Sequence, residues 1–274
     1  NPYSYRVFSF LIGFAGSEKN IWNRGVSEDG FRFLLDGLAV NTNLLWDIPT
    51  IDGFDTMAPK RGQDILAYAG SESTQRRDSA LVFMQIPLED KIKLFASRLP
   101  LLSMLNVKYL ISAYELPPTP GLNLIHTVSS TRFNIPIHLY ENAKVLPRIY
   151  LANGITALPD NDELKNFDIV TDLANDFSKT TFLECPDCQD KKNLPSRKDK
   201  ISINKYQNGL LELTSDIEKG RWLIFSESNL PGWEATIDNQ VTKIYTANYI
   251  FQTIYLPKGS HQIKMEYKGI KWIE

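Results

Sequence analysis

Two acidic residues early in the chain, Asp52 and Asp55, flank a Gly-Phe pair and are followed closely by Lys60 and Arg61. These residue types can do chemistry, because a carboxylate can act as a general base and a nearby cation can bind a phosphate or a sugar acid. The same spacing is also typical of an Asx turn around the glycine, with the phenylalanine packed inward. We favour the turn, and keep Asp52, Asp55 and Arg61 as candidate glycan contacts.

The two cysteines of the chain, Cys185 and Cys188, form a Cys-Pro-Asp-Cys motif between a predicted strand and a polar loop. A redox role needs the first cysteine at a helix N-terminus. A zinc site needs two further ligands, and the three histidines lie far apart in the sequence. We favour a short disulfide or a free pair in a surface loop over a redox or a metal site, and predict no metal ligands.

Aromatic side chains supply the remaining candidate contacts for a sugar. Trp233 follows a Pro-Gly turn and could stand at the rim of a loop, and Tyr249 opens a predicted strand. We favour core packing even for Trp233, because large aromatic side chains dominate protein cores. The motifs GxGxxG, GxxxxGK[ST], GxSxG and HExxH are absent from the sequence. The residues therefore predict no catalytic group and no cofactor.

Length and composition are those of an ordinary globular protein. The chain has 274 residues, of which 43% are hydrophobic and 23% charged, and a formal net charge of −2. This length is enough for two domains. Lysine and arginine form no basic face, so nucleic acid is not an expected partner. No run approaches the roughly 20 apolar residues of a membrane span. The chain starts without methionine and ends on an apolar segment, so we expect a piece of a longer protein.

Residues 201–274 predict an all-β sandwich of the immunoglobulin-like or jelly-roll kind. About seven short strands with period-two alternation are separated by turn signals. Asn208-Gly209 predicts a two-residue hairpin, Asp238–Gln240 predicts a second turn, and Pro257–Ser260 predicts a further hairpin. The strand over 249–256 is apolar on both faces and is expected to be central.

Residues 1–186 predict a mixed α/β (α+β) domain, because strand and helix patterns alternate along them. Apolar residues recur at three- and four-residue spacing over 88–105, which predicts a helix that Pro100 kinks or divides. The polar stretch 187–200 is the predicted linker to the sandwich. The other expected elements are a helix over 61–69, a partly helical segment over 160–179, and strands over 5–11, 31–35, 107–111, 122–128, 137–140, 146–151 and 181–184.

Short motifs in a fixed order carry a resemblance to a known family. Leu105–Ile111 resembles the LxVKYxI element of YfhO-type bacterial membrane proteins, and Tyr140–Asn142 with Leu146–Tyr150 resembles their YEN…LPRAY element. Further matches in the same order are residues 52–55 with a GYD element, 226–235 with SxxYxPGWxA, 247–249 with a RANY-like element and 257–261 with PAGxH. Residues 228–230 depart from the family pattern, which often has an aromatic residue before PGW.

The resemblance implies a parent protein with many membrane helices and a large extracytoplasmic domain, similar to glycosyltransferases of the GT-C architecture. Such proteins use polyprenyl-phosphate-linked sugars, and their catalytic acidic residue lies in an early loop between membrane helices. No part of this chain matches that loop, so no catalytic residue is carried over. The resemblance thus predicts an accessory domain at the extracytoplasmic face of the bacterial cell membrane. Its expected partners are the transmembrane part of its own parent chain and a glycan or polyprenyl-phosphate sugar.

Two other classes of function stay open on the sequence. One is a secreted carbohydrate-binding or adhesion protein with a β-sandwich module, in which Trp233 would contact the glycan. The other is a soluble enzyme that uses the region of Asp52 and Asp55.

Overall fold

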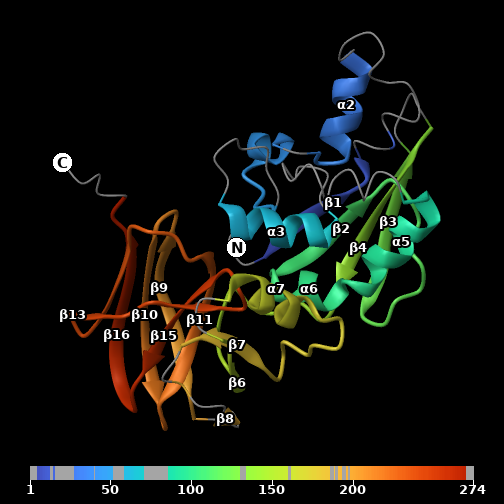
Figure 1. Cartoon of the computed structure of the whole chain (residues 1–274). Coiled ribbons are helices and arrows are strands. Elements are labelled where there is room, and N and C mark those ends of the chain that lie inside the picture. The colour runs from blue at the N-terminus through green and yellow to red at the C-terminus, as the bar shows by residue number, and fades with distance from the viewer. Residues whose placement is uncertain are drawn as a thin grey trace, which may run out of the picture. The chain divides into compact units, whose positions relative to one another are not determined.

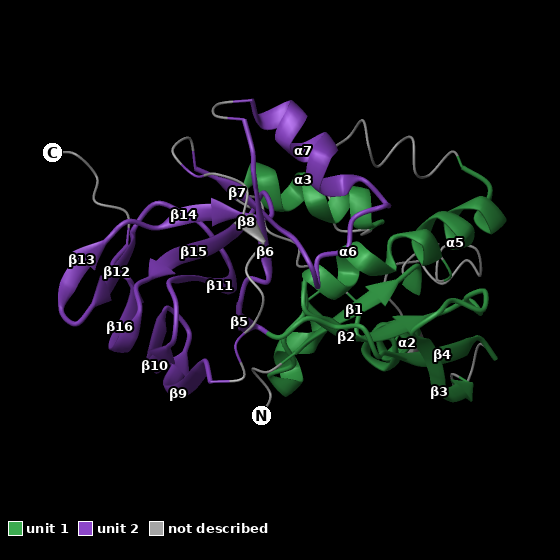
Figure 2. Cartoon of the chain, turned by 90° about the horizontal axis from the view of Figure 1, so that it is seen from below, with its two compact units in different colours: residues 1–147 green, residues 148–274 purple. Residues whose placement is uncertain are grey.

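A computed structural model gives the structure of this chain (Figure 1). It describes residues 5–12, 15, 28–39, 41–51, 59–70, 86–129, 134–159, 162–185, 188, 191–192, 196 and 198–269. The chain divides into two compact units, residues 1–147 and residues 148–274 (Figure 2).

A four-stranded sheet forms the centre of the N-terminal unit, in the order β1-β2-β4-β3. β1 (Arg6–Phe10) runs parallel to β2 (Val107–Ser112). β4 (Pro136–Asn142) is antiparallel to both of its neighbours, β2 and β3 (Leu122–Ser129). The mixture of a parallel pair with antiparallel pairs is consistent with the predicted α/β (α+β) class.

Helices cover both faces of this sheet. On one face, Phe95 of α5 (Leu88–Ser97) stacks on Phe10 of β1, with 3.7 Å between the ring centroids. On the opposite face, Phe33 of α2 (Glu28–Asp36) joins a buried cluster with isoleucines of β2 and β4. The remaining elements of this unit are η1 (Thr42–Trp46), α3 (Lys60–Ala69) and α6 (Leu99–Met104).

The predicted strand over residues 31–35 is wrong, because this segment lies inside helix α2. A strand would place Phe31 and Phe33 on the same face. In the structure Phe33 is buried, whereas Phe31 is 47% exposed. The local alternation of large and polar residues was misleading, because the helical period decides which side chains reach the sheet.

The other helix predictions for this unit are confirmed. The helix expected over 61–69 is α3. The stretch 88–105 is divided into α5 and α6 at Arg98, and Pro100 lies in the first turn of α6. Proline fits there because the first turn of a helix has N–H groups without intrahelical partners.

The C-terminal unit contains two sheets that pack on one another. Its strands are β5 (Ile149–Leu151), β6 (Gly154–Ala157), β7 (Thr181–Glu184), β8 (Lys191–Lys192), β9 (Lys200–Gln207), β10 (Leu210–Ile217), β11 (Arg221–Ser228), β12 (Trp233–Ile237), β13 (Gln240–Thr242), β14 (Tyr245–Ala247), β15 (Phe251–Leu256) and β16 (Gly259–Tyr267). The larger sheet has the order β5-β11-β15-β14-β7-β6-β8, and the smaller has the order β13-β12-β16-β10-β9.

A shared apolar core joins these two sheets. Leucine, isoleucine and methionine side chains of β10 and β16 in the smaller sheet bury against leucine, isoleucine and phenylalanine side chains of β11 and β15 in the larger. Since β15 lies between β11 and β14, the prediction that residues 249–256 form a central strand is confirmed. From β9 to β16 this unit is an all-β, sandwich-like region, as the sequence predicted.

The sandwich begins much earlier in the chain than the expected boundary. The sequence placed residues 1–186 in the first domain and 187–200 in a linker, whereas the compact units divide after Pro147. The reason is long-range pairing: β5 pairs with β11, and β7 pairs with β14. Helix α7 (Glu163–Thr171) connects the parallel strands β6 and β7. Strand β8, which lies inside the expected linker, pairs with β6. Such short strands have too few residues for periodicity to reveal their sheet.

Two of the predicted turns form hairpins, and one connects the sheets instead. Gly209, with a φ of 75°, lies in the turn from β9 to β10, and Asp238 and Asn239, with φ of 51° and 65°, form the turn from β12 to β13. The hairpin predicted at Pro257–Ser260 is wrong, because β15 belongs to the larger sheet and β16 to the smaller. The proline and glycine mark a change of direction correctly, but packing decides which sheet the chain enters.

Candidate functional site

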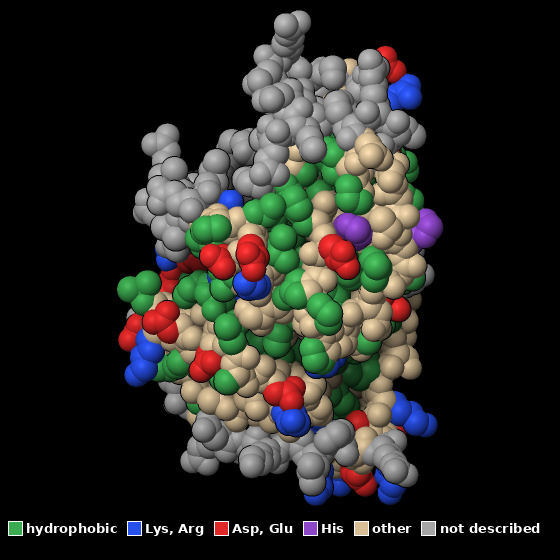
Figure 3. Space-filling view, turned by 90° about the vertical axis from the view of Figure 1, so that its right-hand side faces the viewer, with side chains coloured by type: hydrophobic (Ala, Val, Ile, Leu, Met, Phe, Trp, Pro, Cys, Tyr) green, Lys and Arg blue, Asp and Glu red, His purple; other side chains and the backbone are tan. Residues whose placement is uncertain are grey.

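A shallow, open hollow in the N-terminal unit is a candidate binding site. Its volume is about 390 Å³, and it lies between α5 and the loop that follows β2. It is lined by Glu89, Ile92, Lys93, Glu115, Leu116, Pro117 and Pro118. Figure 3 views the side on which α5 and β3 lie in Figure 1, and shows apolar side chains over much of this face with isolated charged groups between them.

Helix α5 supplies the charged side of the hollow. Glu89 and Lys93 are one turn apart and form an ion pair with 2.6 Å between Oε1 and Nζ. The Lys93 hydrogen bond holds the pKa of Glu89 below its usual value, and Glu89 in turn raises the pKa of Lys93. Both groups therefore stay charged at neutral pH. They can accept hydrogen bonds from ligand hydroxyl groups and donate to ligand oxygens.

The loop after β2 supplies the apolar side. Its prolines and Leu116 can contact the carbon-bound face of a ligand, and Glu115 adds a second carboxylate. Tyr140 of β4 holds this loop in place, because its hydroxyl accepts a hydrogen bond of 2.8 Å from the backbone N–H of Leu116. The lining residues include no cysteine, serine or histidine that could form a nucleophile–base pair. The chemistry that the hollow supports is recognition.

A buried histidine, His138, lies behind this loop. Its Nδ1 is 3.0 Å from the hydroxyl of Thr127 on β3. Burial lowers the pKa of His138, and the negative charge of Glu115 opposes that shift in part. Burial likewise raises the pKa of the neighbouring Tyr140 phenol. Both side chains therefore stay neutral at neutral pH, and Tyr140 supports the loop through its hydrogen bond with Leu116.

Acidification is expected to destabilise the N-terminal unit through His138. Because the pKa of His138 is lowered in the folded chain from its ordinary 6.5, the unfolded chain binds the proton more readily. The free energy of unfolding is then fully retained above about pH 6.5 and decreases as the pH falls below that value. Urea unfolding at pH 7.5 and 5.5 measures the decrease. The variant His138→Gln should show a smaller decrease in the free energy of unfolding between these two pH values. A decrease equal to that of the natural sequence would assign the effect to other groups.

The sequence-predicted glycan contacts do not converge on this hollow. Asp52 and Asp55 lie outside the described residues. Arg61 is half-buried in the first turn of α3. It does not line the hollow.

The two aromatic candidates belong to the C-terminal unit and pack inside it. Trp233 of β12 is half-buried, with its ring edge-on to Phe225 at 6.0 Å and tilted against Tyr267 at 5.7 Å. Tyr249 is 0% exposed, and its ring meets Phe167 of α7 edge-on at 5.4 Å. These contacts give both rings a packing role.

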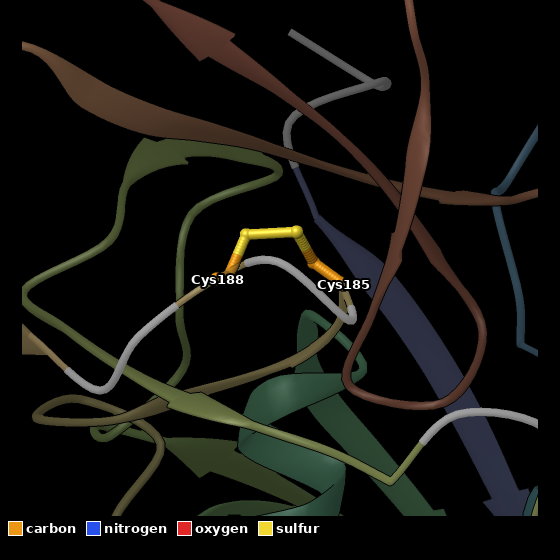
Figure 4. Close-up of a disulfide and its surroundings, with 2 residues drawn as sticks. All are labelled: Cys185 and Cys188. Atoms are coloured by element: carbon orange, nitrogen blue, oxygen red, sulfur yellow. A yellow bond between two sulfur atoms is a disulfide. The ribbon is translucent and has the colours of Figure 1, made fainter.

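Cys185 and Cys188 form a disulfide that closes the turn after β7 (Figure 4). The backbone N–H of Cys188 also donates to the carbonyl of Cys185 at 3.1 Å. Cys185 is buried, with 4% of its surface exposed. In the described part of the chain, no group of three or more histidine, cysteine, aspartate or glutamate side chains is placed to hold a metal ion.

The polar residues of the LxVKYxI and YEN motifs form a buried network in the N-terminal unit. Asn142 is fully buried, and its amide donates to the carbonyl of Val107 at 2.9 Å and to the hydroxyl of Ser103 at 3.0 Å. Asn106, also fully buried and with a φ of 64°, donates to the carbonyl of Leu146 at 2.7 Å. These bonds join α6, β2, β4 and the turn after β4.

The motif residues of the C-terminal unit also make structural contacts. Arg148 of the LPRIY segment forms an ion pair with Glu227 and donates to the hydroxyl of Tyr206 at 3.0 Å. Asn248 is fully buried, and its side-chain oxygen accepts from the backbone N–H of Phe182 at 2.9 Å. Burial also raises the pKa of Tyr150, which keeps that phenol neutral.

The glycine of the PGW element fills a position that other residues cannot. Gly232 has a φ of 100°, and a Cβ there would lie 2.7 Å from the carbonyl oxygen of Gly269. The element is therefore a corner of the backbone. The Pro-Gly turn was predicted from the sequence, whereas the hydrogen-bond partners of the motif residues were not, because they lie tens of positions away. The hollow was missed for the same reason, because its two sides are separated by more than twenty residues in the sequence.

Comparison with known proteins covers the motifs of the C-terminal part of the chain. Residues 169–269 match the family model of the bacterial membrane protein YfhO. The match supports a domain associated with a membrane protein, and confirms the resemblance to the C-terminal region of YfhO-type proteins. No curated protein and no solved structure matches the chain. Across the described residues, no helix has the length and apolar character needed to cross a membrane.

Proposed function

We propose that this chain is a non-catalytic extracytoplasmic domain of a membrane glycosyltransferase-like protein. It caps the membrane part of its parent chain and guides a glycan or polyprenyl-linked sugar during glycosylation of the cell envelope. The main support is the use of the motif residues. The most distinctive polar side chains, Asn106, Asn142, Arg148 and Asn248, are engaged in structural hydrogen bonds. Residues so engaged contribute to a scaffold, which supports an accessory role for the domain.

The hollow beside α5 is where we place the glycan. Sugars present hydroxyl groups on their edges and C–H groups on their faces. The hollow offers carboxylates and a lysine beside prolines, isoleucine and leucine, which match these two kinds of surface. The alternative, a secreted carbohydrate-binding protein that uses Trp233, has less support, because that ring packs against Phe225 and Tyr267.

The decisive experiment compares the 274-residue chain with the complete reading frame that contains it. Membranes that carry the complete protein are expected to transfer sugar from a radiolabelled polyprenyl-phosphate donor to an envelope acceptor, and the 274-residue chain alone is expected to transfer none. Transfer by the isolated chain would contradict the non-catalytic assignment. A complete reading frame without membrane segments would contradict the membrane assignment.

The role of the hollow is tested by two matched pairs of substitutions. Glu89→Gln with Lys93→Gln removes the ion pair at the hollow. Glu28→Gln with Arg32→Gln removes an equivalent pair on α2, which has the same spacing and similar exposure. In the complete protein, the first double variant is expected to raise KM for the acceptor about tenfold with kcat retained, as for lost ground-state binding. The second should leave both constants unchanged, and equal effects would rule out the hollow.

A further inference from the structure

Three consecutive large apolar side chains project from one short element of the N-terminal unit. They are Leu44, Leu45 and Trp46 of the 3-10 helix η1, which are 74%, 64% and 50% exposed. Single exposed apolar residues are common on protein surfaces, but a contiguous group usually marks an interaction site.

The element that carries these side chains is held firmly. The neighbouring Asn43 is buried, and its amide donates to the carbonyl of Ile48 at 2.8 Å. The hydroxyl of Thr42 donates to the carbonyl of Ala39 at 2.6 Å. Just beyond η1, the backbone N–H of Val7 in β1 donates to the carbonyl of Pro49 at 2.8 Å, which ties the segment to the sheet.

The residues on either side of η1 have a left-handed backbone. Asn41 and Asp47 have φ of 67° and 52°, in a region that asparagine and aspartate occupy more readily than most other residues. They therefore mark the two ends of the element that carries the three side chains.

The size and chemistry of the group favour a lipid surface over a protein partner. The three side chains expose on the order of 350 Å², whereas a stable protein interface buries about 800 Å² on each partner. Residues 41–51 contain no lysine or arginine, so attraction to anionic groups does not contribute. Tryptophan prefers the boundary between lipid headgroups and acyl chains, and leucine prefers the apolar side of that boundary.

We propose that Leu44, Leu45 and Trp46 insert into the interfacial region of a lipid bilayer and dock the N-terminal unit on the membrane surface. This inference rests on the membrane association in the proposed function, and adds the surface through which the contact is made. Anchoring of the parent chain would raise the local concentration of this element at the bilayer, so a contact that is weak by itself suffices.

The test uses the 274-residue chain and vesicles of neutral phosphatidylcholine brominated on the acyl chains. Bromine quenches the fluorescence of a tryptophan that reaches the acyl region. Quenching is expected for the natural sequence, with Trp46→Phe losing most of it. The double variant Leu44→Ser, Leu45→Ser should reduce the partition coefficient at least about tenfold, because apolar area no longer leaves water. Partitioning should persist at high salt, since it does not depend on charge.

Leu164 and Val241 provide matched controls, since they are 75% and 84% exposed but stand singly on α7 and β13. Changing either to serine should leave partitioning unchanged. The inference is overturned by an absence of quenching, by equal losses in the controls, or by a lipid-free dimer that the Leu44 and Leu45 substitutions abolish. If the 274-residue chain fails to bind vesicles while the complete protein still transfers sugar, only this inference is overturned. If the complete protein transfers no sugar, or if the complete reading frame encodes no membrane segments, the proposed function is overturned instead.

Discussion

Replacing Arg221 with methionine is expected to lower the free energy of unfolding of the C-terminal unit by about 3–5 kcal/mol, the typical cost of breaking a buried ion pair. Arg221 and Asp199 are 3% and 5% exposed in their side chains, and their charged atoms are 2.7 Å apart. Arg221 also donates to the carbonyl of Ala152 at 2.8 Å. The substitution leaves the Asp199 carboxylate buried without its cation, and leaves that carbonyl without its donor.

The position of this ion pair in the fold adds to the expected effect. Arg221 opens β11 in the larger sheet, and Asp199 immediately precedes β9 in the smaller. The carboxylate of Asp199 also accepts a hydrogen bond of 2.9 Å from the backbone N–H of Glu218. The ion pair therefore holds the edge strand β9 of the smaller sheet to β11 of the larger sheet. Its loss should loosen the pairing of β9 with β10.

Chemical denaturation followed by tryptophan fluorescence measures this loss, since Trp222 lies next to the substituted residue. The double variant Arg221→Met, Asp199→Asn should be more stable than Arg221→Met alone, because it removes the unpaired charge and keeps an oxygen for the Glu218 N–H. Lys198→Met serves as control, since it breaks an exposed ion pair to Glu218 in the same loop and should cost less than about 1 kcal/mol. A small loss for Arg221→Met would mean that the pair contributes little to stability.

In the N-terminal unit the largest effect is expected at Asn142. Replacing it with leucine should lower the free energy of unfolding of this unit by about 2–4 kcal/mol, because several buried groups lose their partners at once. The groups are the carbonyl of Val107, the hydroxyl of Ser103 and the backbone N–H of Lys144, the last at 2.9 Å from the side-chain oxygen of Asn142. Leucine has a similar volume but can satisfy none of them.

Hydrogen exchange read by mass spectrometry can locate this loss within the chain. Faster exchange is expected in β2 and in the turn after β4, with little change in the peptides of the C-terminal unit. Asn123→Leu is the matched control, because Asn123 is an exposed asparagine on the neighbouring strand β3. Equal destabilisation by the two variants, or unchanged exchange around Val107 in Asn142→Leu, would show that the network is not a determinant of the fold.

Asn142 and Arg148 illustrate what the ordered motifs encode. Asn142 belongs to the YEN element, and its partners come from α6 and β2. Arg148 of the LPRIY segment reaches Glu227 at the end of β11. Each motif thus supplies one half of a long-range contact. Such contacts hold each compact unit together, and the YfhO match over residues 169–269 lies within the C-terminal unit.

The sequence by itself determined the features that depend on neighbours in the chain. Local backbone preferences and side-chain periodicity account for the turns at Asn208-Gly209 and Asp238-Asn239 and for helix α3. They also account for the division of residues 88–105 into two helices just before Pro100. The spacing of Cys185 and Cys188 permitted a disulfide, without distinguishing it from other roles.

Only the tertiary structure decided which segments meet. It recruited the short strands of residues 149–192 into the sandwich, turned the expected hairpin at Pro257–Ser260 into a crossing between sheets, and made residues 31–35 part of a helix. It also placed the α5 acid–lysine pair beside the loop of residues 115–118, and left Leu44–Trp46 exposed. The physical reason is common to all of these. Strand pairing and burial depend on which distant surfaces exclude water from one another, and that choice leaves no periodic trace in a segment of three or four residues.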